Sequence, residues 1–448
     1  MVGLFSPTSF NHLTLSRDII VIMKKIFLRL IVIVVFFGCN FSDANYVNAE
    51  EIIKINMDQA IELALQKNVM YQAKKKDLLI AEKQIQVANK LKNPQLFSHN
   101  LIGRVTRGNN SQLGLNVPVE VMKRSARKSV AKAEYEKAKT ELEQYEYNLK
   151  IDVMDAYFEV LCAKSYYVLM VRKEQWYKDI LDYAEKKKDA KDPRYKINVL
   201  RAKIKHEREL IDLNYLRSNV NEAVCNFNKV LNTNERYISY EPVENTFRDN
   251  IYFLNITLPD CDTLVDFAYK HNFELKLNRD DIKIADKNVT LIKRQRVPDM
   301  YLAGGYAYQR YDRHDPYDGA YVTAAIDLPI FYTYRPEIQQ AQITLDRLKY
   351  NKIAYEDLLN YTIQDNYYKF HAHKNNMEKA GKIYNDMDKL LLLESQAYKK
   401  NEIRLMDLMN IEDSQHQYMK EFINSIHLYY KAYLNLLRNL GKDFDEAL

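Results

Sequence analysis

The chain carries one structural plan twice. Residues 58–94 align with residues 262–298 at a constant offset of 204 and without gaps, and the matches include Asn68 with Asn272 and Pro94 with Pro298. Further segments match at offsets of 211 and 209, so the spacing changes only by short insertions. Because self-similarity at a fixed spacing is the signature of a repeated unit, we predict two copies of about 200 residues each.

Each copy reads as a helix, a pair of strands and a long helical hairpin. The first helix is predicted over about 57–93 and 262–297, and a proline ends it in both copies. Apolar and polar residues then alternate over 113–121 and again over 322–330, which is the period of a strand with one apolar face. Their partners are predicted over 96–106 and 300–311.

Long helices follow both strand pairs. Apolar residues step by three and four from Leu149 to Met170 and from Phe422 to Leu440, which is the seam of a coiled coil. We expect one helix over about 122–190, which at 1.5 Å per residue is roughly 100 Å long. Each long helix is predicted to break once, at Asp192-Pro193 and near Asn401, and to return antiparallel.

These patterns divide the chain into nine segments. We expect an export segment over 1–49, a first-copy helix over 50–94, a first strand pair over 95–121, a first long helical hairpin over 122–231, a linker over 232–261, a second-copy helix over 262–298, a second strand pair over 299–331, a second long helical hairpin over 332–440 and a C-terminal tail over 441–448.

The low content of glycine and proline agrees with a fold of long helices joined by few turns. The 448 residues include only 10 Gly and 10 Pro, where average usage predicts about thirty and about twenty. This scarcity disfavours all-β sandwiches, collagen-like chains and doubly wound nucleotide-binding folds. The net charge is +6, and basic and acidic residues are interspersed along the chain. No basic stripe with interleaved aromatic residues for base stacking stands out, so we predict no nucleic-acid partner.

The N-terminus predicts export from the cytoplasm. Met23-Lys24-Lys25 precedes an apolar run that is too short for a convincing membrane span, and translation is expected to begin at Met23 or Met1. Cleavage after Ala49 is favoured, while the alternative is a lipoprotein box that leaves a lipidated Cys39. A disulfide between Cys225 and Cys261 is one interpretation for an oxidising compartment, and separate thiols are the other.

No apolar run long enough for a helical span follows residue 49, so a membrane crossing would have to use strands in a closed barrel. Four strands are too few to close a barrel, since about eight are needed. Other copies of the chain would have to complete it. The predicted fold class is therefore mainly α with a small membrane β-barrel built by an oligomer.

Over residues 52–441 the chain resembles the TolC-type outer-membrane efflux proteins. The resemblance is carried by the duplicated plan, the opening Asp58-Gln59-Ala60, the helix ends at Pro94 and Pro298, and the segments 328–331 and 398–408. It implies a homotrimer in the outer membrane, with a 12-stranded barrel continued into a periplasmic helical tunnel. It also implies a periplasmic adaptor protein and an inner-membrane efflux pump as partners, and small toxic molecules or metal ions as cargo.

The resemblance also implies roles for particular residues. The hairpin tips would dock on the adaptor, and the candidates are Asp192, Pro193, Leu200, Asn401 and Leu405. Asp407 would form a charged ring at a periplasmic gate, where Asn410 stands in place of a second Asp common in the family. Asn401 replaces the usual tip Gly, and Glu120 replaces a usual aromatic residue.

No constellation in the sequence predicts catalysis, a metal centre or a cofactor. His371 and His373 lie two apart on a helix and so point to different faces, and Asp312, His314 and Asp315 are better explained as a polar loop. We therefore predict that the chain is not an enzyme. Two alternative functions stay open: an outer-membrane channel for type I protein secretion, and a secreted periplasmic coiled-coil scaffold.

Overall fold

The computed structural model describes residues 51–101, 108–186, 193–235, 237–247, 256–311, 314–400 and 402–442. The chain divides into the units Met1–Glu51 and Ile52–Leu448, and the second carries the helices and sheets. The predicted signal segment, including Cys39 and Ala49, lies outside the described residues, as do Asp192 and Asn401.

The first copy begins with a short strand, β1 (Glu51–Ile55), and two helices, α2 (Met57–Lys67) and α3 (Val69–Ala88). The strands β2 (Gln95–Leu101) and β3 (Gly108–Val119) follow, then the helices α4 (Lys123–Lys186) and α5 (Pro193–Leu231) and the strand β4 (Ile238–Pro242). The second copy repeats this order with α6 (Cys261–His271), α7 (Phe273–Gln295), β5 (Met300–Tyr311), β6 (His314–Ile326), α8 (Arg335–Lys399) and α9 (Leu405–Leu440).

The first helix of each copy is divided, so the prediction of one continuous helix of about 35 residues is wrong. Asn68 ends α2 and caps α3, accepting from the Tyr71 backbone N at 2.9 Å, and Asn272 does the same for α7 through Leu275 N at 2.8 Å. Asparagine is a preferred N-cap because its side-chain oxygen satisfies a free backbone N–H. The repeat match between these two residues therefore marks a helix junction.

The same asparagines also tie each junction to the end of a long helix. Asn68 Nδ2 donates to the carbonyls of Val230 and Leu231, at 3.0 and 3.1 Å, at the end of α5. Asn272 Nδ2 donates to the Asn439 carbonyl at 2.8 Å, near the end of α9. Both amides are almost fully buried. Each copy thus closes its helical hairpin back onto its own first helices.

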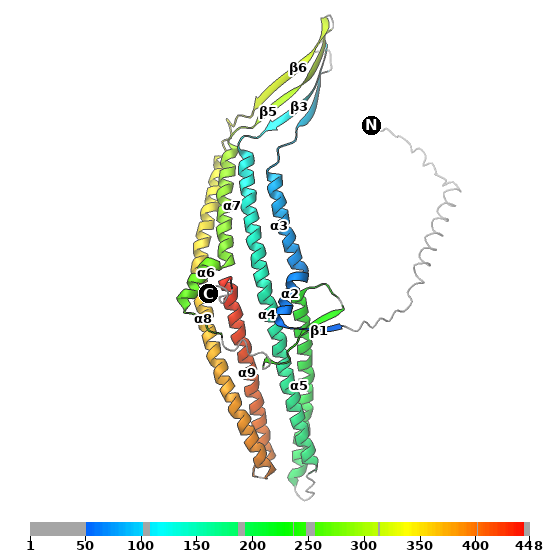
Figure 1. Cartoon of the computed structure of the whole chain (residues 1–448), viewed down its shortest axis with the longest axis vertical. Helices are drawn as coiled ribbons and strands as arrows, with labels where there is room; N and C mark the ends of the chain where they lie inside the picture. The colour runs from blue at the N-terminus through cyan, green and yellow to red at the C-terminus, as the bar shows by residue number, and fades with distance from the viewer. Residues whose placement is uncertain are drawn as a thin grey trace, which may run out of the picture. The chain divides into compact units, whose positions relative to one another are not determined.

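The long helices form two antiparallel pairs, α4 with α5 and α8 with α9, as the heptad pattern predicted (Figure 1). Both predicted seams supply buried residues, among them Val153, Val160, Ile426 and Leu436. The main core joins α2, α4, α5 and α9, and a smaller cluster joins α6, α8 and α9. Among the described residues, none of the helices combines the length and the apolar character that a membrane span requires.

Four strands form one antiparallel sheet in the order β2-β3-β5-β6, extending from one end of the helices (Figure 1). The prediction that the second strand pair continues through Leu328-Pro329-Ile330 is wrong, because β6 ends at Ile326. Pro329 has no N–H to donate to a neighbouring strand. Pro118 is tolerated inside β3 because β2 pairs only as far as Asn116, so that side of β3 has no partner at Pro118.

Candidate functional site

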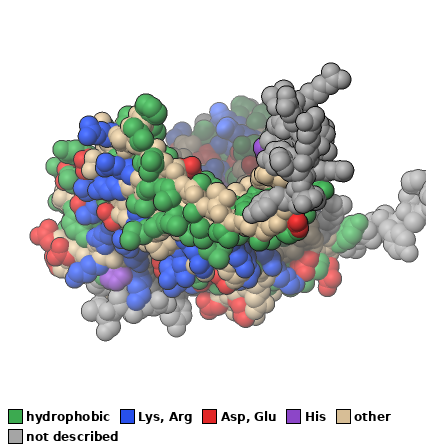
Figure 2. Space-filling model, turned by 90° about the horizontal axis from the view of Figure 1, so that it is seen from above, with side chains coloured by type: hydrophobic (Ala, Val, Ile, Leu, Met, Phe, Trp, Pro, Cys, Tyr) green, Lys and Arg blue, Asp and Glu red, His purple; other side chains and the backbone are tan. Residues whose placement is uncertain are grey.

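The four-stranded sheet has one apolar face that is exposed in the single chain. The register places side chains of alternating strand positions on this face, and its exposed members are Leu96, Leu113, Leu115, Val117, Val119, Leu302, Tyr306, Val322 and Ile326. Soluble proteins rarely leave so continuous an apolar surface open to water. Seen from above, a band of hydrophobic side chains runs beside gathered Lys and Arg side chains (Figure 2).

The opposite face of the sheet is hollowed and carries polar side chains among small and aromatic ones. A cavity of about 330 Å³ opens there, lined by Gln95, Phe97, Asn116, Tyr301, Ala303, Thr323 and Ala325. Gly114 and Gly305 face each other on this side, under the hydroxyl of Tyr321. A Cβ on Gly305 would lie 2.5 Å from the Gly114 Cα, so the close approach of β3 and β5 needs glycine here. The sheet therefore separates an apolar side from a mixed side, where Gln95, Asn116 and Thr323 supply polar groups.

A salt-bridge cluster fixes the sheet to the helices. The Arg127 guanidinium donates from both Nη atoms to the two carboxylate oxygens of Glu120, at 3.0 Å each. Lys123 Nζ lies 2.9 Å from Asp299, and Lys92 contacts Glu120 at 3.3 Å. The Glu120 side chain is 4% exposed. This explains the carboxylate at a position where the resemblance leads one to expect an aromatic residue: it anchors the start of α4.

The helical hairpin tips lie at the opposite end of the long helices, and the structure separates the predicted docking residues. Leu200 on α5 is 59% exposed, and Pro193 begins that helix. Leu405 is only 5% exposed and packs with Tyr177 and Met409. The Leu405 side chain is therefore buried within the chain, whereas Leu200 is open to solvent, and the docking role of both stays a prediction.

The candidate gate residue Asp407 has a partner that the sequence did not suggest. Arg404 Nε and Nη2 donate to the two Asp407 oxygens at 3.0 and 3.1 Å, across the first turn of α9. This hydrogen bonding lowers the pKa of Asp407, so its carboxylate stays charged but paired. Asn410 is exposed, and its carbonyl accepts from Ser414 Oγ at 2.8 Å.

A partly buried ion cluster joins the two helical hairpins, and sequence reasoning missed it. Asp413 on α9 accepts from Tyr177 Oη at 2.9 Å, contacts Lys173 at 3.2 Å and is paired with Lys205. Burial acts to raise the pKa of Asp413, but the hydrogen bonds from Lys205 and Tyr177 outweigh it and hold the pKa below its ordinary value. The partners are more than 200 residues apart, so no local spacing could have indicated them.

The remaining candidates of the sequence analysis are cysteines, histidines and a group of residues near β6. Cys225 is exposed and Cys261 half-buried, and both are free thiols, so the interpretation of a disulfide between them is wrong. His371 and His373 are half-buried on α8, and His314 and Asp315 belong to β6 while Asp312 lies outside the described residues. No group of three His, Cys, Asp or Glu side chains that could hold a metal occurs in the described part of the chain.

Comparison with known proteins reveals likeness in structure only. No family model and no curated protein matches the sequence. The solved outer-membrane channel OprN matches with a TM-score of 0.70 at 14% identity, over 86% of this chain and 90% of OprN. CusC matches with a TM-score of 0.68 at 12% identity, over 90% and 96% of the two chains. The Campylobacter jejuni CmeC outer membrane channel matches with a TM-score of 0.63 at 14% identity, over 88% of each. The chain therefore has the fold of these channels, which confirms at the level of fold the resemblance stated from the sequence.

Proposed function

We propose that this chain is the outer-membrane channel of a tripartite efflux system and exports toxic small molecules or metal ions. The observation that carries the proposal is the sheet with one exposed apolar face and one hollowed face that contains polar groups. Strands of ten or so residues with alternating faces suit a membrane crossing in which lipid covers the apolar side and water the polar side. The long helices would then extend through the periplasm.

The open edges of the sheet support assembly into a homotrimer. In the described sheet β2 and β6 stand at the two edges, and unpaired backbone groups are not tolerated in lipid. Three copies would bring twelve strands together, enough for the barrel that the sequence predicted. Each β6 would pair with the β2 of a neighbouring copy.

Exposed apolar side chains on the helices support the same assembly. Ile197, Ile204 and Ile211 are spaced seven residues apart on α5 and are each more than half exposed. Tyr361 and Tyr368 on α8 repeat that spacing, with exposures of 68% and 66%. A heptad stripe open to water is the seam of an incomplete coiled coil. In the proposed trimer, helices of neighbouring copies would cover these stripes.

The hairpin tips would dock on a periplasmic adaptor connected to an inner-membrane pump. Leu200 supports this role because it is an exposed apolar side chain near the start of α5. Asp407 and Asn410 lie near the start of the neighbouring hairpin's α9, where threefold symmetry would gather three copies around one axis. Three Asp407–Arg404 pairs at such an axis would form the proposed gate.

The test uses two neighbouring positions of β3 that face opposite sides of the sheet. Leu115→Lys places a charge on the apolar face, where lipid would oppose it by about 2–4 kcal/mol at the bilayer midplane. We expect this variant to be lost from the outer membrane. Asn116→Lys is the matched control on the hollowed face, and we expect it to assemble at the wild-type level.

Two results would contradict the proposal. One is a folded monomer in the light scattering of detergent-purified protein. The other is equal recovery of Leu115→Lys and Asn116→Lys in the outer-membrane fraction. Recovery of the wild-type chain in the soluble periplasm would instead favour the coiled-coil scaffold.

A further inference from the structure

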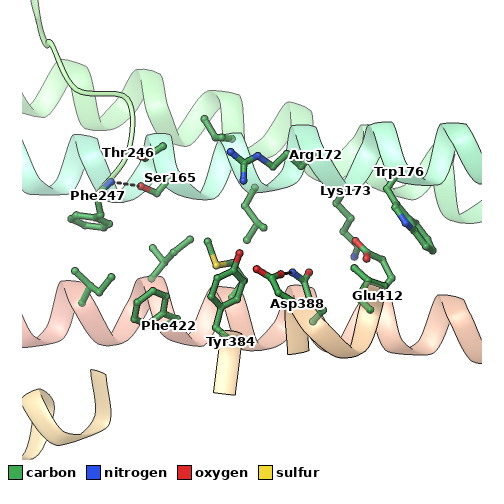
Figure 3. Close-up of a pocket in the computed structure, with 17 residues that line it drawn as sticks. Ser165, Arg172, Lys173, Trp176, Thr246, Phe247, Tyr384, Asp388, Glu412 and Phe422 are labelled. Atoms are coloured by element: carbon green, nitrogen blue, oxygen red, sulfur yellow. Dashed lines mark hydrogen bonds between the residues drawn. The ribbon is translucent and has the colours of Figure 1, made fainter. Parts of the chain in front are cut away.

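A cavity lies between α4 and α9, with α8 and the segment 246–247 also in its wall (Figure 3). Its volume is about 360 Å³, within the range of pockets that hold small organic molecules. The apolar part of its wall includes Leu169, Trp176, Leu391, Met419 and Phe422. Its polar part comes from α4, α8 and α9, and Figure 3 shows Lys173, Asp388 and Glu412 directed into the space between these helices.

Glu412 lines this cavity with a carboxylate oxygen that has no hydrogen-bond partner. The residue is 5% exposed, and its Oε2 atom is buried without a hydrogen-bond partner. A buried carboxylate without a partner is costly, so the side chain favours any donor that enters the cavity. The cavity therefore offers both a space and an unused acceptor.

The basic side chains near Glu412 either form ion pairs with other carboxylates or are exposed to solvent. Lys173 Nζ is shared by Glu209 at 3.0 Å and Asp413 at 3.2 Å. Arg172 also lines the cavity but is exposed to solvent. On the facing helix α8, Asp388 adds a second carboxylate, which accepts from Gln415 Nε2 at 2.6 Å. Asp388 is exposed to solvent, as Arg172 is, so among the residues that line the cavity Glu412 is the one buried carboxylate, and its Oε2 atom is left without a donor.

We propose that this cavity binds a small organic cation, an ammonium group attached to an apolar body. The ammonium would donate to Glu412 Oε2, and the apolar body would pack against Leu169, Met419 and Phe422. Trp176 lies in the same wall, and an aromatic ring attracts a cation that reaches its face. All lining residues come from one chain, so the proposal does not rest on the channel assembly or on the proposed export.

A bare metal ion fits the cavity less well than an organic cation. Metal sites in proteins gather several His, Cys, Asp or Glu ligands, and the described residues contain no such group of three. A single unpaired carboxylate beside a largely apolar wall instead matches a ligand whose charge is confined to one end. This combination makes the charge and the apolar body of the ligand separately testable.

The test uses the chain's own fluorescence, because Trp176 is its one tryptophan. Full-length protein in detergent is titrated at pH 8, above the Glu412 pKa of about 7, with 1-adamantylammonium, and the matched probes are uncharged 1-adamantanol and anionic 1-adamantanecarboxylate. We expect a saturable change in Trp176 emission with the ammonium and a binding constant at least about ten-fold weaker with the other two, as the loss of a charged hydrogen bond implies.

Variants locate the site. Glu412→Gln keeps the size of the side chain and removes its charge, and we expect about ten-fold weaker binding of the ammonium. Glu421→Gln, an exposed position on the same helix, is the matched control and should bind as the wild type does. Leu391→Phe reduces the cavity volume and should weaken binding while Glu412 is kept.

Three results would overturn the proposal. The first is the absence of saturable binding of 1-adamantylammonium to the wild-type protein, by fluorescence and by calorimetry. The second is equal affinity for the ammonium and for 1-adamantanol, since charge would then play no part. The third is wild-type binding by both Glu412→Gln and Leu391→Phe, which would place the ligand elsewhere.

Discussion

Replacing Glu412 by Gln should change the stability of the chain in a pH-dependent way. Burial raises the pKa of the Glu412 carboxyl from its ordinary 4.5 to about 7, while Lys173 acts in the opposite direction. Asp413, Glu209 and Asp388 add to the increase as negative neighbours. The folded chain therefore holds a proton on Glu412 in a pH range where the unfolded chain has released it.

The sign follows from this difference in proton binding. Because the folded state binds more protons between pH 4.5 and about 7, the stability of the wild type falls as the pH rises through that window. The full increase in pKa corresponds to about 3 kcal/mol, at roughly 1.4 kcal/mol per pKa unit. Glutamine does not titrate. We therefore expect Glu412→Gln to gain about 3 kcal/mol relative to the wild type between pH 4 and pH 8.

The assay is thermal unfolding of detergent-purified protein, followed by circular dichroism at pH 4 and pH 8. The unfolding midpoint of Glu412→Gln should exceed that of the wild type at pH 8 and approach or fall below it at pH 4. Glu421→Gln, at an exposed position of α9, is the matched control variant. His416 lies one turn away, and burial lowers its pKa to about 3, so it stays neutral throughout this range.

The reasoning about Glu412 would be refuted by a difference between Glu412→Gln and the wild type that does not change with pH. A larger gain at pH 4 than at pH 8 would refute it as well, because the sign would be reversed. Both measurements are made without any added ligand, so they test the buried carboxyl separately from the proposed cation site.

Three further predictions concern the helical hairpins. Asp413→Asn should lower the unfolding midpoint at pH 7, with a loss of about 1–3 kcal/mol in the free energy of unfolding. The reason is that Lys173, Lys205 and the Tyr177 hydroxyl lose a charged acceptor. An unchanged midpoint would show that the ion cluster does not stabilise the fold. In planar bilayers, Asp407→Asn should reduce cation selectivity and block by trivalent cations. Arg404→Gln removes the positive partner of Asp407 and should increase both quantities. Selectivity and block that are unchanged in both variants would exclude this pair from the gate. Leu200→Glu should abolish export from cells while the assembled protein stays in the membrane, and normal export would remove Leu200 from the adaptor contact.

The sequence identified the repeated plan and most of the elements because both depend on short-range patterns. Alternating residues predicted β3 and the last part of β6, and the three-and-four spacing predicted the paired long helices that the structure contains. The division at Asn68 and Asn272 was not predicted, since an asparagine within a helical pattern does not by itself reveal a cap. The repeat alignment did contain that signal: the two residues are the same because each ties a helix start to a distant helix end.

The candidate sites depended much more on tertiary structure. Leu200 and Leu405 look alike in the sequence, but only the packing of α4 against α9 buries Leu405 and leaves Leu200 exposed. The ion cluster around Asp413 and the cavity beside Glu412 exist because two hairpins from different copies of the repeat lie against each other. Periodicity and capping act over a few residues and can be read locally. Burial and charge pairing depend on which distant surfaces meet, and the folded chain alone decides that.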